Sequence, residues 1–192
     1  MILASYLANK NYHVTVLIFD NRDDIYLIRE KESFELLTSN KKSFIRSIPF
    51  IIKFISGKKP KYIFSTFAYI SLFLIFLKKI LKFKLICRES NLNSLRNVSG
   101  FKNRWVMRFS GLYRHADMFL ASSNLMQNHF VRSYGIDRSK SVVWANPVDV
   151  ERIRGLVDAE DTSEWTGVLG RRFLAVGRLE KQKNFGQLLE WF

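Results

Sequence analysis

The sequence is poor in the residues that form disulfides and metal sites. Cys87 is the single cysteine among 192 residues, so an intramolecular disulfide is excluded. It ends the apolar run Leu85–Cys87, where we expect a buried and unreactive thiol. The histidines His13, His115 and His129 are far apart, and no cluster of Cys and His has the spacing of metal ligands. We therefore expect no metal site.

Long apolar runs are also missing. The longest, from Tyr62 to Leu77, is shorter than the roughly 20 residues that a bilayer-crossing helix needs. Its hydroxyl residues, Ser65, Thr66 and Ser71, favour a division into a strand and a buried helix that follows it. The first residues lack the basic region of a signal peptide. The sequence therefore predicts a cytoplasmic protein, with peripheral attachment to the inner face of the cell membrane left open.

Acidic residues are scarce in one long stretch of this chain, whose formal net charge is +14. Between Leu36 and His115, Glu89 is the only carboxylate. The cations of the same stretch are Lys41, Lys42, Arg46, Lys53, Lys58, Lys59, Lys61, Lys78, Lys79, Lys82, Lys84, Arg88, Arg96, Lys102, Arg104, Arg108 and Arg114. This charge distribution attracts anions, whether phospholipid, nucleic acid or a phosphorylated substrate.

The hydrophobic fraction of 47% is high enough for a buried core. Predicted strands cover residues 13–19, 26–29, 34–37, 62–65, 84–87, 118–121 and 141–144, and predicted helices cover residues 2–7, 43–55, 68–81, 104–114 and 123–134, with a loop at 57–60. The alternation predicts an α/β fold with a doubly wound parallel sheet. Residues 151–170, which carry a group of acidic side chains, are the expected linker between residues 1–150 and residues 171–192.

The C-terminal residues predict a turn that binds phosphate. The apolar run Phe173–Val176 ends in Gly177, Arg178 and Lys183 follow, and a helical pattern begins at Phe185. A strand, a turn and a helix in this order place the cations at the carboxyl end of the strand, where open α/β sheets bind ligands. Cations are disfavoured at a helix start because the macrodipole is positive there. A phosphate or diphosphate ligand therefore explains them better than solvation of the helix end.

Four short phrases occur in order along the chain. They are His13–Leu17, Ala116–Ser123, Asn146–Asp149, and Gly177–Leu179 together with Gln182–Asn184. Together they resemble the corresponding phrases of family-4 glycosyltransferases, which have the GT-B fold. The resemblance implies that residues 1–150 form the Rossmann-like N-terminal, acceptor-side domain without its first strand. It also implies that residues 171–192 begin the donor-binding domain with its first β-α unit.

The resemblance extends to the residues of a donor site. In that family, an arginine and a lysine spaced like Arg178 and Lys183, beside a glycine at the position of Gly177, grip the diphosphate of a nucleotide-sugar. The nucleotide-sugar is a substrate, so the resemblance implies no cofactor. The catalytic residues stay unassigned, because the family's paired glutamates would lie beyond Phe192.

The loop that follows the strand 84–87 is implied to contact the acceptor or the sugar. Its matching residues are Glu89, Ser90 and Asn91. The family often has a histidine in this loop, and the departure leaves the role open. An ion pair of Glu89 with Arg88, Arg96 or Arg104 explains that residue equally well.

Two further pairs of residues are candidates for the cleft expected between the two domains. Ser65 and Thr66 end the preceding strand, although a structural turn explains them better. Asn146 and Asp149 lie at the expected crossover between the domains, where turn formation is the main explanation and a donor contact the lesser one.

The implied function is transfer of a sugar from a nucleotide-sugar to an acceptor, with retention, during synthesis of a bacterial surface polysaccharide or lipopolysaccharide. The basic and apolar segment 41–61 suits an anionic membrane that carries a lipid-linked acceptor, and a core helix with a basic rim is the alternative. We expect a chain truncated at both ends and inactive by itself. The alternatives are an inactive, basic membrane-associated module or one half of a split glycosyltransferase. Nucleic-acid binding rests on charge alone, and we expect none.

Overall fold

The computed structural model describes residues 2–19, 33–39, 41, 43–89, 108–159, 173–179 and 183–191. The elements are α1 (Ile2–Asn9), β1 (Thr15–Ile18), β2 (Glu35–Thr38), α2 (Phe44–Lys58), β3 (Tyr62–Ser65), α3 (Ala68–Lys78), β4 (Lys84–Glu89), the 3-10 helix η1 (Ser110–His115), β5 (Met118–Ala121), α5 (Asn124–Tyr134), the 3-10 helix η2 (Arg138–Lys140), β6 (Ser141–Val143), α6 (Val150–Ala159) and α7 (Phe185–Glu190). The chain divides into two compact units, Met1–Val148 and Asp149–Phe192, each of which is described by itself.

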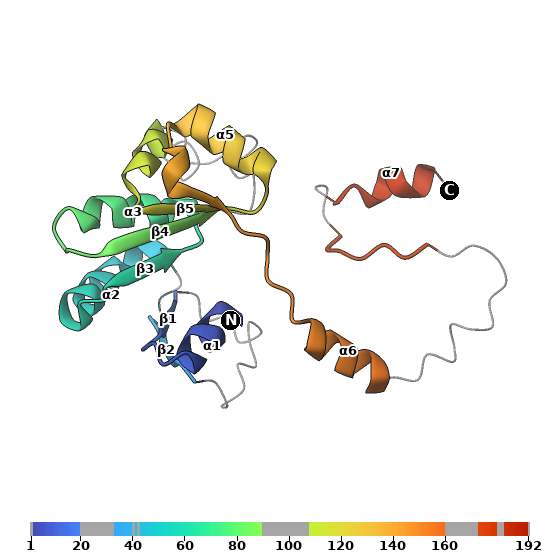
Figure 1. The fold of residues 1–192 in the computed structure, drawn as a ribbon, viewed down its shortest axis with the longest axis horizontal. Coiled ribbons are helices and arrows are strands. Elements are labelled where there is room, and N and C mark those ends of the chain that lie inside the picture. Colours follow the sequence, from blue (N-terminus) through green and yellow to red (C-terminus); the bar gives the residue numbers. More distant parts are fainter. Residues whose placement is uncertain are drawn as a thin grey trace. The chain divides into compact units, whose positions relative to one another are not determined.

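The first unit contains two parallel sheets with helices between the strands (Figure 1). One sheet pairs β1 with β2, and the other has the order β3-β4-β5-β6. In the larger sheet every neighbouring pair is parallel, so each connection must return across the sheet. Helices α3 and α5 and the 3-10 helix η1 make those returns. The predicted α/β architecture with parallel strands is confirmed.

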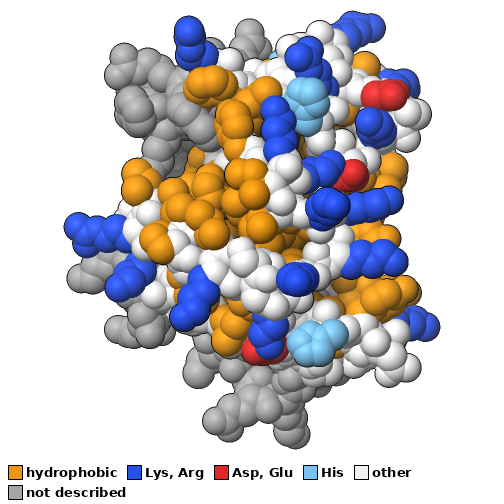
Figure 2. All heavy atoms as spheres, turned by 90° about the vertical axis from the view of Figure 1, so that its left-hand side faces the viewer, with side chains coloured by type: hydrophobic (Ala, Val, Ile, Leu, Met, Phe, Trp, Pro, Cys, Tyr) orange, Lys and Arg blue, Asp and Glu red, His pale blue; other side chains and the backbone are white. Residues whose placement is uncertain are grey.

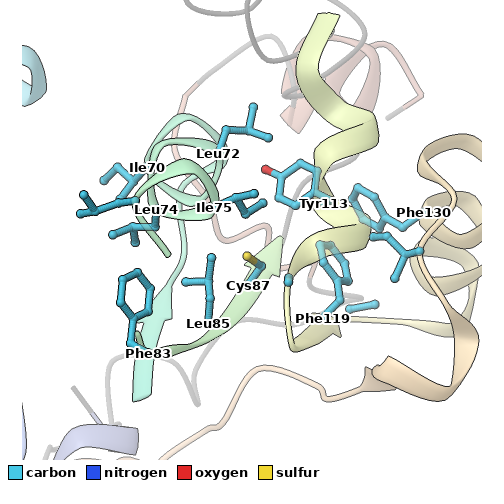
Figure 3. Packing of buried hydrophobic residues seen from close by; sticks show 14 of the residues in the cluster. Ile70, Leu72, Leu74, Ile75, Phe83, Leu85, Cys87, Tyr113, Phe119 and Phe130 are labelled. Atoms are coloured by element: carbon cyan, nitrogen blue, oxygen red, sulfur yellow. The ribbon is translucent and has the colours of Figure 1, made fainter. Parts of the chain in front are cut away.

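The core lies between the larger sheet and the helices on one of its faces. Alternate residues of β4 point to this face, so Leu85 and Cys87 are fully buried. They pack in one cluster with α3 and with the aromatic rings of Tyr113 and Phe119 (Figure 3). Burial raises the pKa of the Cys87 thiol to about 12, and the predicted buried cysteine is confirmed.

Asp117, directly before β5, links the starts of two strands of the larger sheet to the end of α3. The Asp117 carboxylate accepts a hydrogen bond from the Leu85 N–H at 2.7 Å and lies 2.5 Å from the Lys78 ammonium. Lys78 also donates to the His115 carbonyl at 3.2 Å. Burial of Asp117 opposes its ionisation, but the Lys78 ammonium and the Leu85 N–H hold the pKa of Asp117 below its usual value. One side chain thus joins the end of α3 to the starts of β4 and β5.

Local capping signals set the bounds of α5 and α2. Ser123 accepts a hydrogen bond from the Met126 N–H at 3.3 Å, and Gly135 has a φ of 64°. The predicted helix 123–134 is therefore confirmed. Helix α2 continues through Gly57 to Lys58, beyond the predicted start of the loop, and Lys59 ends it in the left-handed conformation. The predicted loop at 57–60 was wrong in its first residues, because the packing of Ile55 in the core holds the last turn of the helix.

Two predicted elements of the first unit lie partly or wholly outside the described residues. The predicted strand at 26–29 is outside the described residues, as is the start of the predicted helix 104–114. The last turns of that helix are present as the 3-10 helix η1.

The second unit departs most from prediction. Residues 173–176 form no strand, and their apolar side chains are exposed, with Leu174 81% accessible. A strand needs a neighbour to receive its backbone hydrogen bonds, and the described part of this unit contains no other strand. The predicted helix from Phe185 is confirmed as α7, whereas α6 occupies much of the expected linker 151–170.

Candidate functional site

The carboxyl edge of the larger sheet carries polar residues where β3 and β4 end. Parallel strands end at the same edge, and the register sets Glu89 of β4 beside Ala121 of β5, which lies beside Val143 of β6. Thr66 follows β3 at this edge and is exposed. Crevices at the carboxyl ends of parallel strands are the usual ligand sites of such sheets. This edge is therefore the candidate site of the first unit.

Glu89 is the last residue of β4, and its side chain is turned into the protein. Only 4% of the residue is accessible, and the Tyr113 hydroxyl donates a hydrogen bond to Glu89 Oε1 at 2.8 Å. Burial raises the pKa of Glu89 to about 7, although the Tyr113 hydrogen bond acts in the opposite direction. A carboxyl group with this pKa exchanges a proton near neutral pH. In the described part of the chain, Glu89 pairs with a tyrosine rather than with Arg88, while Arg96 and Arg104 lie outside that part.

Arg88 lies on the opposite face of the sheet from Glu89 and reaches the chain beyond β6. Its Nη2 donates to Asn146 Oδ1, and its guanidinium lies 5.9 Å from the centroid of the Trp144 ring. Arg88 is half-buried, and its buried Nε has no hydrogen-bond partner. The result is a guanidinium fixed on two sides near the carboxyl edge, with one donor still unused. An anionic or carbonyl oxygen is the natural partner of such a group.

The sequence did not single out Arg88 as a site residue. Its contact with Asn146 joins positions that are 58 residues apart, and no local spacing signals such a contact. The one available signal was its place beside Glu89 at the end of a strand. Asn146 had been predicted as a turn residue at the domain crossover, and it does lie in the segment between β6 and α6.

The hydroxyl residues at the end of β3 divide into two kinds. Ser65 is buried, and it receives a hydrogen bond from the Ser71 hydroxyl of α3 at 2.9 Å. This bond ties the strand to its helix and favours the structural explanation for Ser65. Thr66 is exposed at the edge. Ser90 and Asn91 lie outside the described residues, and their predicted roles stay predictions.

The second unit brings two of the three predicted donor-site residues together. A side-chain carbon at Gly177 would lie 3.5 Å from Lys183 Cδ and 3.3 Å from Phe185 Cζ. The backbone at Gly177 therefore passes directly against the Lys183 stem, and Arg178 is the next residue along the chain. The Asp149 carbonyl accepts the first hydrogen bond of α6, from Ile153 N–H at 3.1 Å. The assignment of Gly177, Arg178 and Lys183 to a diphosphate stays a prediction.

Two other kinds of site are absent from the described residues. Among them, no three His, Cys, Asp or Glu side chains are grouped as metal ligands would be. None of the helices in the same residues is long and apolar enough to cross a membrane.

Comparison with known proteins identifies a family. The family model described as Glycosyltransferase Family 4 matches residues 1–152, which include the whole first unit. No curated protein matches the chain.

Proposed function

Because the chain belongs to glycosyltransferase family 4, we propose that it serves the transfer of a sugar from a nucleotide-sugar donor to an acceptor. The proposed setting is assembly of a bacterial surface polysaccharide or lipopolysaccharide on a lipid carrier, at the inner face of the cell membrane. The observation that carries the proposal is the family match over residues 1–152 together with the Arg88 and Glu89 groups at the carboxyl edge.

The first unit is the proposed acceptor side. A hydroxyl acceptor must be oriented and must lose a proton as its new bond forms. Glu89 is the proposed partner for that proton, because a pKa of about 7 lets the buried carboxyl accept or donate a proton near neutral pH. On the other face of the sheet, Arg88 is a proposed contact for a charged or carbonyl oxygen, and Thr66 is a further proposed contact at the edge. Ser90 and Asn91 belong to the proposed site as neighbours of Glu89 in sequence.

The second unit carries the proposed donor contacts. Breaking the bond between sugar and diphosphate puts negative charge on the leaving diphosphate, and two fixed cations stabilise that charge. Arg178 and Lys183 are the proposed cations. Gly177 lets the backbone approach closely, since a side chain there would meet Lys183 and Phe185. Transfer with retention is proposed from the family alone.

We also propose that the chain is inactive by itself or is one half of a split enzyme. A basic module without activity is the competing proposal. Transfer activity that appears when a second polypeptide with the paired glutamates is added would favour the split enzyme.

Isothermal titration of the chain with UDP, GDP and their sugar conjugates tests the donor assignment. We expect saturable, salt-resistant binding of one nucleotide class, weakened about tenfold or more by Arg178→Ala or Lys183→Ala, since each removes a charged hydrogen-bonding partner. Arg154→Ala is the matched control, because Arg154 is an exposed arginine of the same unit. Equal effects of all three substitutions would remove the roles of Arg178 and Lys183. Absence of binding in a chain that circular dichroism shows to be folded would leave the acceptor side as the whole contribution.

A further inference from the structure

The larger sheet has two faces, and the structure buries one of them. Helices α3 and α5 and the 3-10 helix η1 pack on the core face, in one cluster with Leu85, Cys87 and Phe119. Side chains alternate between the faces along each strand, so the residues between these point the other way. We define the outer face by those residues and by Trp144, which lies against Arg88: Tyr62, Phe64, Lys84, Ile86, Arg88, Met118, Leu120, Val142 and Trp144.

Large apolar side chains of the outer face are open to solvent. Tyr62 is 55% accessible, Val142 44% and Met118 39%. The register sets Phe64 beside Ile86 and Ile86 beside Met118, so one apolar row crosses three strands. The strands of a parallel sheet are normally buried on both faces, and a contiguous exposed apolar patch marks an interaction site. The outer face is therefore a surface on which a further layer fits.

The charged side chains of the outer face are all positive. At the amino edge, where the strands begin, Lys84 is exposed beside Tyr62, and the Lys61 ammonium lies 5.7 Å from the centroid of the Tyr62 ring. Arg88 is near the other end of β4, whereas Glu89, the one carboxylate of the four strands, is turned to the core face. Figure 2 shows the side of the molecule at which β3 and β4 begin, where Lys and Arg side chains are many and carboxylates few. The outer face therefore suits a partner that carries negative charges.

Arg88 is the charged group best prepared for such a partner. Its guanidinium is held between the Asn146 side chain and the Trp144 ring, so a partner does not have to order it. The described contacts of Arg88 leave its Nε without an acceptor. A guanidinium pairs most strongly with a carboxylate, which can accept two parallel N–H bonds. Because the group has five donors, a carboxylate on the outer face leaves others for a further oxygen.

We propose that the outer face binds a helix of a partner protein, with an apolar stripe along the sheet and carboxylates that meet Arg88 and Lys84. A helix is about 10 Å across and neighbouring strands lie about 4.8 Å apart, so one helix covers two strands. Lys84 and Arg88 lie about 13 Å apart along β4, which corresponds to about nine residues of a helix that runs along the strand. A second copy of the outer face is a poor partner, because the same cations would meet each other. The proposal is independent of any sugar-transfer activity.

Fluorescence anisotropy of a labelled helical peptide, titrated with the 192-residue chain, tests the proposal. The probe is a designed helix of about 18 residues, or five turns, with leucines along one face and glutamates beside them, and its counterpart has lysines in place of the glutamates. We expect saturable binding of the glutamate peptide, and binding of the lysine peptide that is weaker about tenfold or more. Arg88→Ala should weaken binding of the glutamate peptide about tenfold, because a charged hydrogen-bonding partner is lost. Met118→Ser should weaken that binding as well, without changing the net charge.

The matched controls are Arg132→Ala and Leu125→Ser, which change an exposed cation and an exposed aliphatic residue of α5, a helix on the core face. Circular dichroism checks that each variant is folded. Binding that Arg88→Ala and Met118→Ser weaken, and that both controls retain, would support the proposal. Absence of binding of the glutamate peptide, equal binding of both peptides, or equal losses in the controls would overturn it.

Two other occupants of the outer face are tested with the same variants. A dimer of the unchanged chain in sedimentation, which Met118→Ser dissociates, would make a second copy the occupant and overturn the proposal. Binding of anionic vesicles that Met118→Ser abolishes would make a membrane the occupant and overturn it as well.

Discussion

The two edges of the larger sheet have opposite chemistry. Among the described residues, the amino edge carries the exposed lysines around Ile80, whereas the carboxyl edge carries the buried Glu89, the fixed Arg88 and the hydroxyl of Thr66. Both edges belong to the same strands, so the fold alone does not explain the difference. A net charge read from composition hides it as well. In the described part of the first unit, the exposed lysines of the amino edge are therefore separated from Glu89, Arg88 and Thr66 by the length of the strands.

The largest expected difference between the edges is a pH dependence of the stability of the fold, caused by Glu89 at the carboxyl edge. Its pKa is about 7 in the folded chain and 4.5 as an ordinary carboxyl, so the folded state binds more protons between these values. Stability therefore falls as pH rises from 4.5 to 7 by at most about 3 kcal/mol, and Glu89→Gln should remove this fall. Urea unfolding at pH 5 and pH 8 measures it. Glu151→Gln, on exposed α6, should keep the fall; a Glu89→Gln variant that also kept it would contradict the assignment.

The second effect belongs to the amino edge. Asp117→Ala should lower the free energy of unfolding by about 2 kcal/mol, because Lys78 and the Leu85 N–H both lose their acceptor. The measurement is again urea unfolding. Asp137→Ala is the control, since the Asp137 side chain bonds only to Ser139 among the described residues and caps the short helix η2. A loss no larger than that of the control would show that Asp117 does not fasten the strands.

The third effect returns to the carboxyl edge. Tyr113→Phe keeps the ring in the core but removes the hydrogen bond to Glu89, so we expect a loss of about 1 kcal/mol. Because that hydrogen bond lowers the pKa of Glu89, its removal should also move the fall in stability to higher pH. Tyr134→Phe, in the same aromatic cluster, should leave the pH dependence unchanged. A Tyr113→Phe variant whose stability kept the unchanged pH dependence would mean that Tyr113 acts through packing alone.

The smallest effect concerns the link between β4 and the chain beyond β6. Arg88→Ala should cost only about 0.5 kcal/mol, since Asn146 and Trp144 are exposed and cation–π contacts at such sites are weak. It should nevertheless speed hydrogen exchange at residues 144–146, as mass spectrometry can measure. Arg108→Ala, at an exposed arginine before η1, should leave that exchange unchanged. Equal exchange in both variants would mean that Arg88 does not hold this segment.

Features with local causes were predictable from the sequence. The strand 118–121 and the helix after Ser123 were predicted with the correct bounds, because Ser123 and Gly135 mark the helix ends by their own conformations. The parallel α/β architecture followed from the alternation of apolar runs and helical patterns. Long-range contacts were not predictable. The bonds from Arg88 to Asn146 and from Tyr113 to Glu89 depend on how strands line up, and no spacing of residues reports that.

The strand predicted at residues 173–176 is absent for a related reason, because its formation depends on a contact that local signals do not report. An apolar run and a glycine are local signals, but a strand exists only where a neighbour completes its hydrogen bonds. The described part of the second unit offers no such neighbour, so the run stays exposed. The donor-site prediction at Gly177, Arg178 and Lys183 shares this dependence on the rest of a sheet.

Urea unfolding of the unchanged chain and of the variants Glu89→Gln and Asp117→Ala, each at pH 5 and pH 8, tests the contrast between the edges most directly. The account predicts that Glu89→Gln removes the fall in stability between the two pH values, whereas Asp117→Ala keeps that fall and lowers stability at both. A fall that persists with Glu89→Gln, or that disappears with Asp117→Ala, would contradict the account.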